Sequence, residues 1–204
     1  MGKLISLDFD DVIYDLMELN INYIDTKHGI PDIDKQIEHY YWLYQTFPDI
    51  GDNLWNNPDN YIRGRLVSGA KEFYDKLVEL VGEDNIQIVT SSMPNVVEKK
   101  DIMIKEFGFN CDIVHSIFGV HPKHHYTKNT LLIDDAIGNI IDHVGHNQCY
   151  GILFNHRGLD YIRKANNGMS YPYVETYNDL LDILKRRLID EKEISVYKRD
   201  RRLL

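Results

Sequence analysis

The chain has 204 residues, of which 43% are hydrophobic and 27% are charged, and its formal net charge is −9. This composition is that of an ordinary globular protein, and its length suits one domain that carries an insertion. The acidic balance disfavours a large nucleic-acid surface, which normally needs a basic face. No apolar run approaches membrane-spanning length, so we expect no membrane partner.

Two further features bear on the cellular compartment. The beginning of the chain shows no signal-peptide pattern, because a strand-like run starts at Lys3. The two cysteines, Cys111 and Cys149, lie near apolar residues without metal-ligand spacing, which is typical of reduced core thiols. We therefore expect a cytoplasmic protein.

The first predicted strand covers residues 3–9 and ends in two acids, Asp8 and Asp10. Strand side chains alternate with a period of two, so these carboxylates point in the same direction. Such a pair is costly unless a cation or a proton lies between the two groups. The C-terminal ends of strands are also where open α/β sheets bind ligands. Surface strands often end in acids too, so this pair alone is a weak signal.

Residues 13–67 form a segment that is too long for a simple crossover between two strands. It contains two helical patterns, followed by a stretch rich in Pro, Gly and Asn at residues 48–60. The first pattern is Val12, Leu16, Leu19 and Tyr23, and the second is Ile37, Tyr40, Tyr41, Tyr44 and Phe47. We interpret the segment as a small helical cap. Its aromatic rings either pack the cap's own core or face a ligand, and the candidates are Tyr41, Trp42, Tyr44, Phe47 and Trp55.

Strands alternate with helices in the rest of the chain. The expected strands cover residues 86–92, 112–118, 130–134, 150–154 and 173–174, and the expected helices cover 68–81, 95–107 and 177–188. This alternation predicts an α/β fold with a Rossmann-like parallel sheet and helices on both faces. We expect a core of residues 1–12 and 68–190, a cap of residues 13–67, and a solvated basic tail of residues 191–204.

Two of these later strands also end in residues that can do chemistry. The strand at 86–92 contains Thr90 and Ser91 near its end, and the strand at 130–134 runs into Asp134 and Asp135. Lys123 and Lys128 precede that last pair. We favour Lys123 as an anion ligand, because a lysine needs some length of loop to reach back across the strand ends. Lys99 and Lys100 follow Thr90 in a predicted helix, where solvated lysines are expected.

In this order, Asp-x-Asp, Thr-Ser, Lys and Asp-Asp on successive strand ends resemble the motifs of the haloacid-dehalogenase-like (HAD) phosphohydrolase superfamily. The resemblance covers residues 3 to about 155. It implies a phosphohydrolase in which Asp8 is the nucleophile and Asp10 the general acid and base. Asp11 differs from the pattern, because many family members have Gly at that position.

The same resemblance implies the ligands of the phosphate and of a magnesium ion. Thr90, Ser91 and Lys123 correspond to the phosphate-binding residues. Asp8, Asp10, Asp134 and Asp135 correspond to the residues that hold Mg²⁺, with Asp135 favoured over Asp134 as a direct ligand. Hard carboxylate oxygens suit this ion, which offsets the charge of a phosphomonoester.

Within the superfamily the chain is most similar to the 5′(3′)-deoxyribonucleotidases. The residues that carry this similarity are Thr90-Ser91, Leu131 to Asp135 with Asn139-Ile140 after it, Gly151 to Phe154, and Ser68 to Phe73. This similarity implies a small phosphomonoester as substrate, foremost a deoxynucleoside monophosphate. It implies no nucleic-acid partner, and it leaves a homodimer as one option for the assembly. The alternatives are a phosphatase of nucleic-acid ends or of another phosphorylated metabolite, and a non-catalytic protein that binds a phosphorylated ligand.

Overall fold

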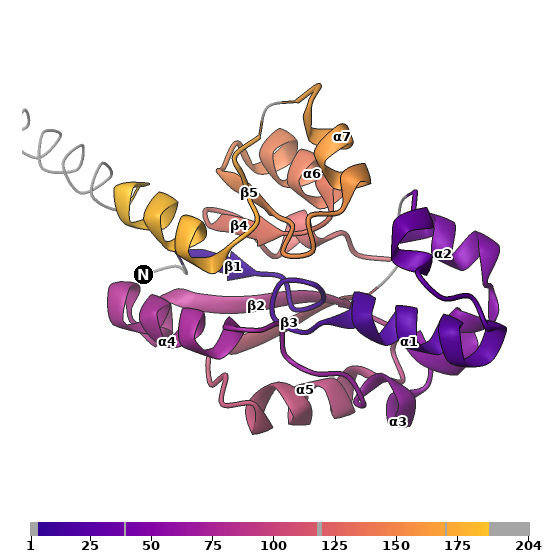
Figure 1. The fold of residues 1–204 in the computed structure, drawn as a ribbon. Helices are drawn as coiled ribbons and strands as arrows, with labels where there is room; N and C mark the ends of the chain where they lie inside the picture. The colour runs from indigo at the N-terminus through magenta and orange to yellow at the C-terminus, as the bar shows by residue number, and fades with distance from the viewer. Residues whose placement is uncertain (1–3, 39, 118–119, 170, 188–204) are drawn as a thin grey trace, which may run out of the picture.

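The structure is a computed structural model that describes residues 4–38, 40–117, 120–169 and 171–187, without the side chains of residues 40 and 41. Its centre is a six-stranded sheet in the order β3-β2-β1-β4-β5-β6 (Figure 1). Every neighbouring pair of strands is parallel. The prediction of a Rossmann-like α/β fold with a parallel sheet is therefore confirmed.

The strands form at the apolar runs of the sequence. They are β1 (Ile5–Leu7), β2 (Ile86–Ser92), β3 (Asp112–Ile117), β4 (Leu131–Asp134), β5 (Gly151–Phe154) and β6 (Tyr173–Val174). The strand expected over residues 3–9 ends earlier than predicted. The Phe9 carbonyl accepts hydrogen bonds from the backbone N–H groups of Ile13 and Tyr14, so the chain turns into a tight loop after β1.

The helices are α1 (Leu16–His28), α2 (Tyr40–Thr46), α3 (Pro58–Tyr61), α4 (Ala70–Val81), α5 (Val97–Glu106), α6 (Ile137–Asn147) and α7 (Asp160–Asn166). Residues 177–187 are also helical. The apolar pattern starts at Val12, but helix α1 begins only at Leu16. The reason is that Asp15 caps the helix by accepting a hydrogen bond from Glu18 N at 3.1 Å. It ends at Gly29, whose φ of 65° is in the left-handed region.

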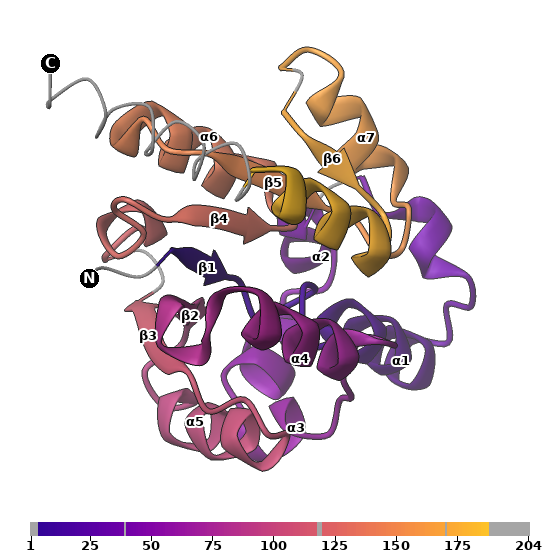
Figure 2. The same cartoon turned by 90° about the vertical axis from the view of Figure 1, so that its left-hand side faces the viewer.

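The two faces of the sheet are covered by different helices, because successive strand residues point to opposite sides. Leu132 and Leu153 form one cluster with Ile140 of α6 and Ile162 of α7. The alternate residues of β4 and β5 belong to the main cluster, to which α4 and the helix at 177–187 contribute. Figure 2 shows α6 and α4 on opposite sides of the sheet.

The inserted segment has a hydrophobic cluster of its own, which includes Ile24, Ile33, Leu43 and Leu54. Its two ends lie together, because Ile13 O accepts a hydrogen bond from Val67 N and Arg65 O accepts one from Asp15 N, each at 2.8 Å. Figure 1 shows this segment at one end of the sheet. An insertion between residues 13 and 67 requires such paired ends, and its use as a cap stays a prediction.

Three other expectations concern single features of the chain. In the part of the chain that the structure describes, no helix is long and apolar enough to cross a membrane. Both cysteines are free thiols; Cys111 is buried, whereas Cys149 is only half-buried and so less of a core thiol than expected. The basic tail of residues 191–204 lies outside the described residues.

Candidate active site

The candidate site lies where the strand order of the sheet reverses. The chain runs outward from β1 to β2 and β3 on one side, and from β4 to β5 and β6 on the other. Asp8 directly follows β1, Asp134 ends β4, and Thr90 lies near the end of β2. Ligands of open α/β sheets bind in the crevice at such a switch point. The fold thus brings the separate predicted motifs to one edge.

Lys123 binds the two acids that flank this switch point. Its Nζ lies 2.5 Å from Asp8 Oδ2 and 2.9 Å from Asp134 Oδ2. Asp8 is only 4% exposed, and its Oδ1 accepts a hydrogen bond from Phe9 N at 2.6 Å. Lys128, in contrast, is exposed to solvent. Of the two candidate lysines, the structure therefore brings Lys123 to the carboxylates.

Burial makes the charges at these strand ends costly. It raises the pKa of Asp8 from 3.8 to about 7, with Lys123 opposing this rise and Asp134 and Asp10 adding to it. Burial also raises the pKa of Asp135 well above its usual range, and the nearby charge of Asp11 contributes. Carboxylates with raised pKa values in a cleft are typical of sites that act on a proton or bind a cation.

A group of three carboxylates fits a magnesium ion. Asp8, Asp134 and Asp135 each offer an oxygen within 4.8 Å of the other two. Hard oxygen donors are the ligands that Mg²⁺ prefers. Asp134 Oδ1 already accepts hydrogen bonds from Ala136 N at 2.9 Å and Asn139 Nδ2 at 3.0 Å. Because Asp134 is engaged in this way, Asp135 remains our choice for the direct ligand.

Asp10 belongs to a second set of contacts beside the first. Lys100 Nζ lies 2.7 Å from Asp10 Oδ2 and donates a hydrogen bond to Thr90 Oγ1 at 2.6 Å. Thr90 Oγ1 lies 3.3 Å from Asp10 Oδ2. The hydroxyl of Tyr61, from α3 of the inserted segment, donates to Asp10 Oδ1. Asp10 is thus held by the core on one oxygen and by the insertion on the other.

The expectation that Lys100 is a solvated helix lysine is wrong, because its side chain is only 1% exposed. Burial lowers the pKa of this lysine, whereas the charge of Asp10 opposes that change. A sequence signal did exist: Lys100 shares the buried face of α5 with Met103 and Ile104, at helical spacing. A lysine in an apolar stripe needs a buried partner. Lys99, by comparison, is exposed and pairs with Asp59.

Ser91 differs from its expected place beside Thr90. Its hydroxyl contacts Ser116 Oγ on the neighbouring strand β3 at 3.0 Å. The physical reason is the pleat of β2, which sends adjacent side chains to opposite faces of the sheet. Thr90 therefore reaches Asp10 and Lys100, whereas the side chain of Ser91 points elsewhere.

The candidate aromatic residues divide into two kinds. Phe47 is 6% exposed inside the cluster of the inserted segment, and the partly buried Trp42 packs edge-on against it. These two rings pack within the insertion itself, which is one of the two alternatives that the sequence left open for the aromatic residues. Tyr44 is 41% exposed and stacks on Trp55, with ring centroids 6.1 Å apart. Trp55 also packs against the cluster of the inserted segment, and its Nε1 donates a hydrogen bond to Asn20 Oδ1 at 2.8 Å. The side chain of Tyr41 lies outside the described residues.

The raised pKa of Asp8 predicts how stability depends on pH when no metal is bound. A carboxyl group whose pKa is higher in the folded than in the unfolded state stabilises the protein at low pH, and this contribution is lost as pH rises through the folded value. With a pKa of about 7 instead of 3.8, Asp8 should lower the free energy of unfolding by up to roughly 4 kcal/mol as pH rises from about 4 to 7. Urea unfolding in EDTA across this range measures the effect.

Two matched variants separate the contribution of Asp8 from those of other groups. Asp8→Asn should reduce the slope, because the amide does not titrate, whereas Asp11 and Asp135, whose pKa values burial also raises, keep their contributions. Asp75→Asn, which changes an exposed acid paired with Lys71, should leave the slope as it is. An unchanged slope in Asp8→Asn would show that Asp8 is ionised in the fold without penalty.

The architecture has clear likenesses among solved structures. YfnB from Bacillus subtilis, a candidate HAD-hydrolase solved with bound magnesium, aligns with a TM-score of 0.59 and 15% identity, over 90% of this chain and 98% of that one. L-2-haloacid dehalogenase from Xanthobacter autotrophicus aligns with a TM-score of 0.57 and 14% identity, over 91% and 99%. The same enzyme with chloropropionic acid covalently bound has a TM-score of 0.56, 12% identity and the same coverage.

No protein-family model matches the chain, and no curated protein matches it significantly. At these identities the structural likeness speaks for the fold alone. The chain has the fold of the HAD-like hydrolases, and it carries buried acids at the end of the first strand and at the end of the neighbouring strand of that fold.

Proposed function

We propose that this protein is a magnesium-dependent phosphomonoesterase that acts through an aspartyl-phosphate at Asp8. The observation that carries the proposal is the placement of Asp8 at the switch point, 2.5 Å from Lys123 and within 4.8 Å of ligand atoms of Asp134 and Asp135. A nucleophile, a fixed cation and a set of hard oxygen donors are what attack on a dianionic phosphate needs.

In the first step, a carboxylate oxygen of Asp8 attacks phosphorus and the bond between phosphorus and the ester oxygen breaks. The carboxyl group of Asp10 gives its proton to the departing oxygen. In the second step, the Asp10 carboxylate takes a proton from the water that attacks phosphorus, and the bond to Asp8 breaks to release inorganic phosphate. Lys123 holds positive charge beside the reacting carboxylate throughout.

Magnesium held among Asp8, Asp134 and Asp135, with Asp135 preferred over Asp134 as a direct ligand, would supply positive charge to the phosphate oxygens. The contacts of Lys100 and Tyr61 fix the orientation of Asp10, which in this proposal protonates the leaving group. The HAD fold also supports dehalogenases, as the Xanthobacter enzyme shows. We favour phosphate because the acidic set at the strand ends suits a metal ion and its dianionic substrate better than a metal-free halide displacement.

For the substrate we propose nucleoside monophosphates, with deoxynucleotides foremost. A phosphate-release screen with Mg²⁺ tests this against ribonucleotides, sugar phosphates, end-phosphorylated oligonucleotides and a simple aryl phosphate. A further arm measures halide release from 2-chloropropionate. Halide release without phosphate release would replace the phosphatase by a dehalogenase, and faster cleavage of oligonucleotide ends would favour the nucleic-acid alternative.

The stacked pair Tyr44 and Trp55 provides the sharper prediction. Stacking of a base on an aromatic side chain is worth about 1–3 kcal/mol. If one of these rings contacts the base, its replacement by Ala should raise KM for a deoxynucleotide about tenfold or more, with a smaller change for the aryl phosphate. Steady-state kinetics on both substrates measure the difference.

Phe47→Ala is the matched control, because this ring lies inside the insertion's own cluster. It should lower the melting temperature without separating the two substrates. If neither Tyr44→Ala nor Trp55→Ala distinguishes the deoxynucleotide from the aryl phosphate, the rings do not read a base, and the nucleotidase proposal reduces to a phosphatase of unspecified substrate.

A further inference from the structure

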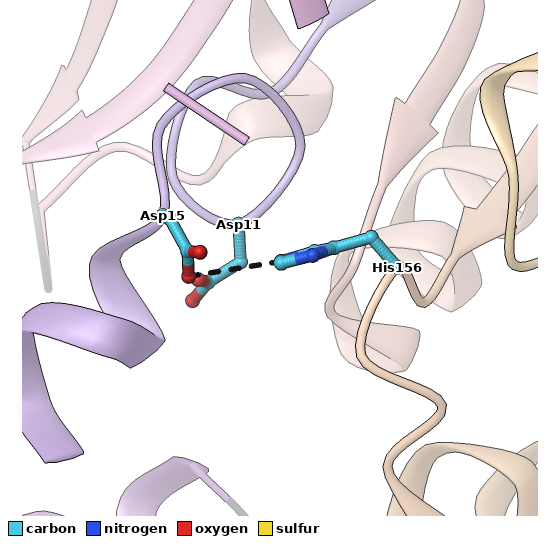
Figure 3. A group of neighbouring side chains, drawn as sticks. All are labelled: Asp11, Asp15 and His156. Carbon is cyan, nitrogen blue, oxygen red and sulfur yellow. Dashed lines mark ion pairs between the residues drawn. The ribbon is translucent and has the colours of Figure 1, made fainter. Parts of the chain in front are cut away.

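A second group of metal-ligand side chains lies outside the residues to which the proposed phosphatase assigns a role. Asp11, Asp15 and His156 each offer a ligand atom within 4.8 Å of the other two (Figure 3). They come from three places in the chain: the turn after β1, the residue that caps α1, and the loop after β5. The group shares no residue with the cluster of Asp8, Asp134 and Asp135.

One carboxylate oxygen of Asp11 is buried without a hydrogen-bond donor. The residue is only 5% exposed, and its Oδ2 is buried without a hydrogen-bond partner. Its Oδ1 accepts a hydrogen bond from Met17 N at 2.7 Å. Figure 3 shows the carboxylate of Asp11 beside that of Asp15, with the ring of His156 directed toward both. A buried carboxylate oxygen without a donor is costly, so a positive group at this point would be strongly stabilised.

His156 completes the arrangement from the other side. Its Nε2 is also buried without a hydrogen-bond partner, and it lies 3.9 Å from Asp15 Oδ1. That distance is too long for a hydrogen bond. Two ligand atoms that each lie about 2 Å from one shared ion are at most about 4 Å apart, so an ion can touch both of these atoms when it lies between them. The spacing therefore suits coordination better than direct pairing.

Asp15 already has other partners, and they leave room for an ion. Arg157 Nη2 lies 2.8 Å from Asp15 Oδ1 and 3.0 Å from Oδ2, Arg157 Nε lies 3.1 Å from Oδ1, and Oδ1 also accepts the capping bond from Glu18 N. A carboxylate offers about four lone-pair sites. Three of these contacts go to Oδ1, the oxygen that lies 3.9 Å from His156 Nε2, and one goes to Oδ2, so the oxygen of Asp15 with capacity for a metal is Oδ2.

A small void beside Asp11 and His156 provides space for an ion. The titratable residues that line a void of about 10 Å³ are Asp11, Asp135, His156 and Arg157. This volume is close to the room that one water molecule or ion needs. On the other side, Asp15 and His156 line a cavity of about 660 Å³ whose described lining does not include Asp8 or Asp10. An ion held by the three side chains would therefore have access to solvent for entry.

We propose that Asp11, Asp15 and His156 form a second metal site, which takes a divalent transition-metal ion. Two carboxylates and an imidazole are a mixed oxygen and nitrogen set, which favours ions such as Mn²⁺ or Zn²⁺ over Mg²⁺. Such an ion would join the start of the inserted segment to the loop after β5. Asp11 has a φ of 55°, a conformation that glycine adopts without strain and aspartate less readily. The structure thus keeps an acid where a glycine would fit the backbone.

Pulsed electron paramagnetic resonance of the full chain with Mn²⁺ tests the site. The proposed active site offers only carboxylate oxygens, so coupling of bound Mn²⁺ to a ¹⁴N nucleus of an imidazole reports an ion bound by histidine outside the active site, and the variants identify that histidine. We expect this coupling in the wild type and its loss in His156→Gln and in Asp11→Gly. Affinity for the nitrogen-coordinated ion should fall more than about tenfold in each, since even partners outside a ligand set are worth 10–100-fold.

Asp11→Gly removes the carboxylate but should leave the protein folded, because glycine adopts a φ of 55° without strain. His146→Gln is the matched control: this exposed histidine stacks on His124, and its loss should leave the ¹⁴N coupling intact. Absence of the coupling in the wild type, or its survival in His156→Gln, would overturn the proposal. Loss of the coupling in His146→Gln alone would do the same, by moving the ion to the surface histidines. None of these results depends on phosphatase activity.

Discussion

Replacing Asp8 by Asn should abolish phosphate release while the protein stays folded. The amide has no charged oxygen to attack phosphorus, so no aspartyl-phosphate forms. Removal of an essential nucleophile costs roughly 10⁴-fold or more in turnover. The fold should survive, because an amide oxygen can still accept the hydrogen bond from Phe9 N and Lys123 keeps Asp134 as its partner. Phosphate release and circular dichroism on the same sample measure both effects.

Two companions make this result interpretable. Asp75→Asn should retain wild-type release, since this acid is exposed and lies in a surface pair. Asp10→Asn should lose roughly 10²–10⁴-fold, the usual contribution of general acid–base catalysis. Release by Asp8→Asn at a rate near that of the wild type would refute the nucleophile, and a loss of less than tenfold in Asp10→Asn would refute the acid–base role.

Lys123→Ala should be the most damaging single change to stability at this site. The side chain is 3% exposed and is the partner of two buried carboxylates, Asp8 and Asp134. Removing one member of a buried ion pair leaves uncompensated charge and costs roughly 3–5 kcal/mol. Loss of a preorganised positive group at the reacting centre should also lower turnover by about 10²–10³-fold. Urea unfolding and phosphate release test the two effects separately.

Lys128→Ala is the matched control, because this lysine is exposed and lies only five residues further along the chain. The free energy of unfolding of the Lys128→Ala variant should differ from that of the wild type by less than about 0.5 kcal/mol. The loss of stability in Lys123→Ala should be smaller at pH 5. This pH is below the pKa of about 7 of Asp8, so the Asp8 carboxyl group can take up a proton and lose its charge. If Lys128→Ala had the larger effect on turnover, the phosphate ligand would be Lys128 and our assignment would be wrong.

Local patterns in the sequence were sufficient to predict the sheet. Runs such as Ile86 to Ser92 and Leu131 to Asp134 are apolar, short and bounded by turn residues, and each became a strand within one or two residues of its expected limits. Ends were less predictable where a backbone turn decided them. The strand expected to reach Phe9 stops at Leu7, because the Phe9 carbonyl closes the following loop.

The acidic strand ends could also be found from the sequence, because Asp8 directly follows its strand, Asp134 is the last residue of its strand, and parallel strands end at one edge. The partners of those acids could not. Lys100 meets Asp10 across 90 residues of chain, and Tyr61 meets it across 51. Such pairings depend on which surfaces pack: α5 against the loop after β1 for Lys100, and the inserted segment against the core for Tyr61.

By itself, then, the sequence determined the parallel α/β architecture, the acids at the strand ends and the helical insertion, since apolar periodicity and turn residues act over a few neighbouring positions. Only the tertiary structure decided that Lys100 is buried, that Ser91 turns away from Thr90, and that Asp11, Asp15 and His156 converge. The physical reason is that the local sequence pattern determines on which face of a helix or strand a side chain lies. The packing of elements distant in sequence determines which charged or polar group that side chain then contacts.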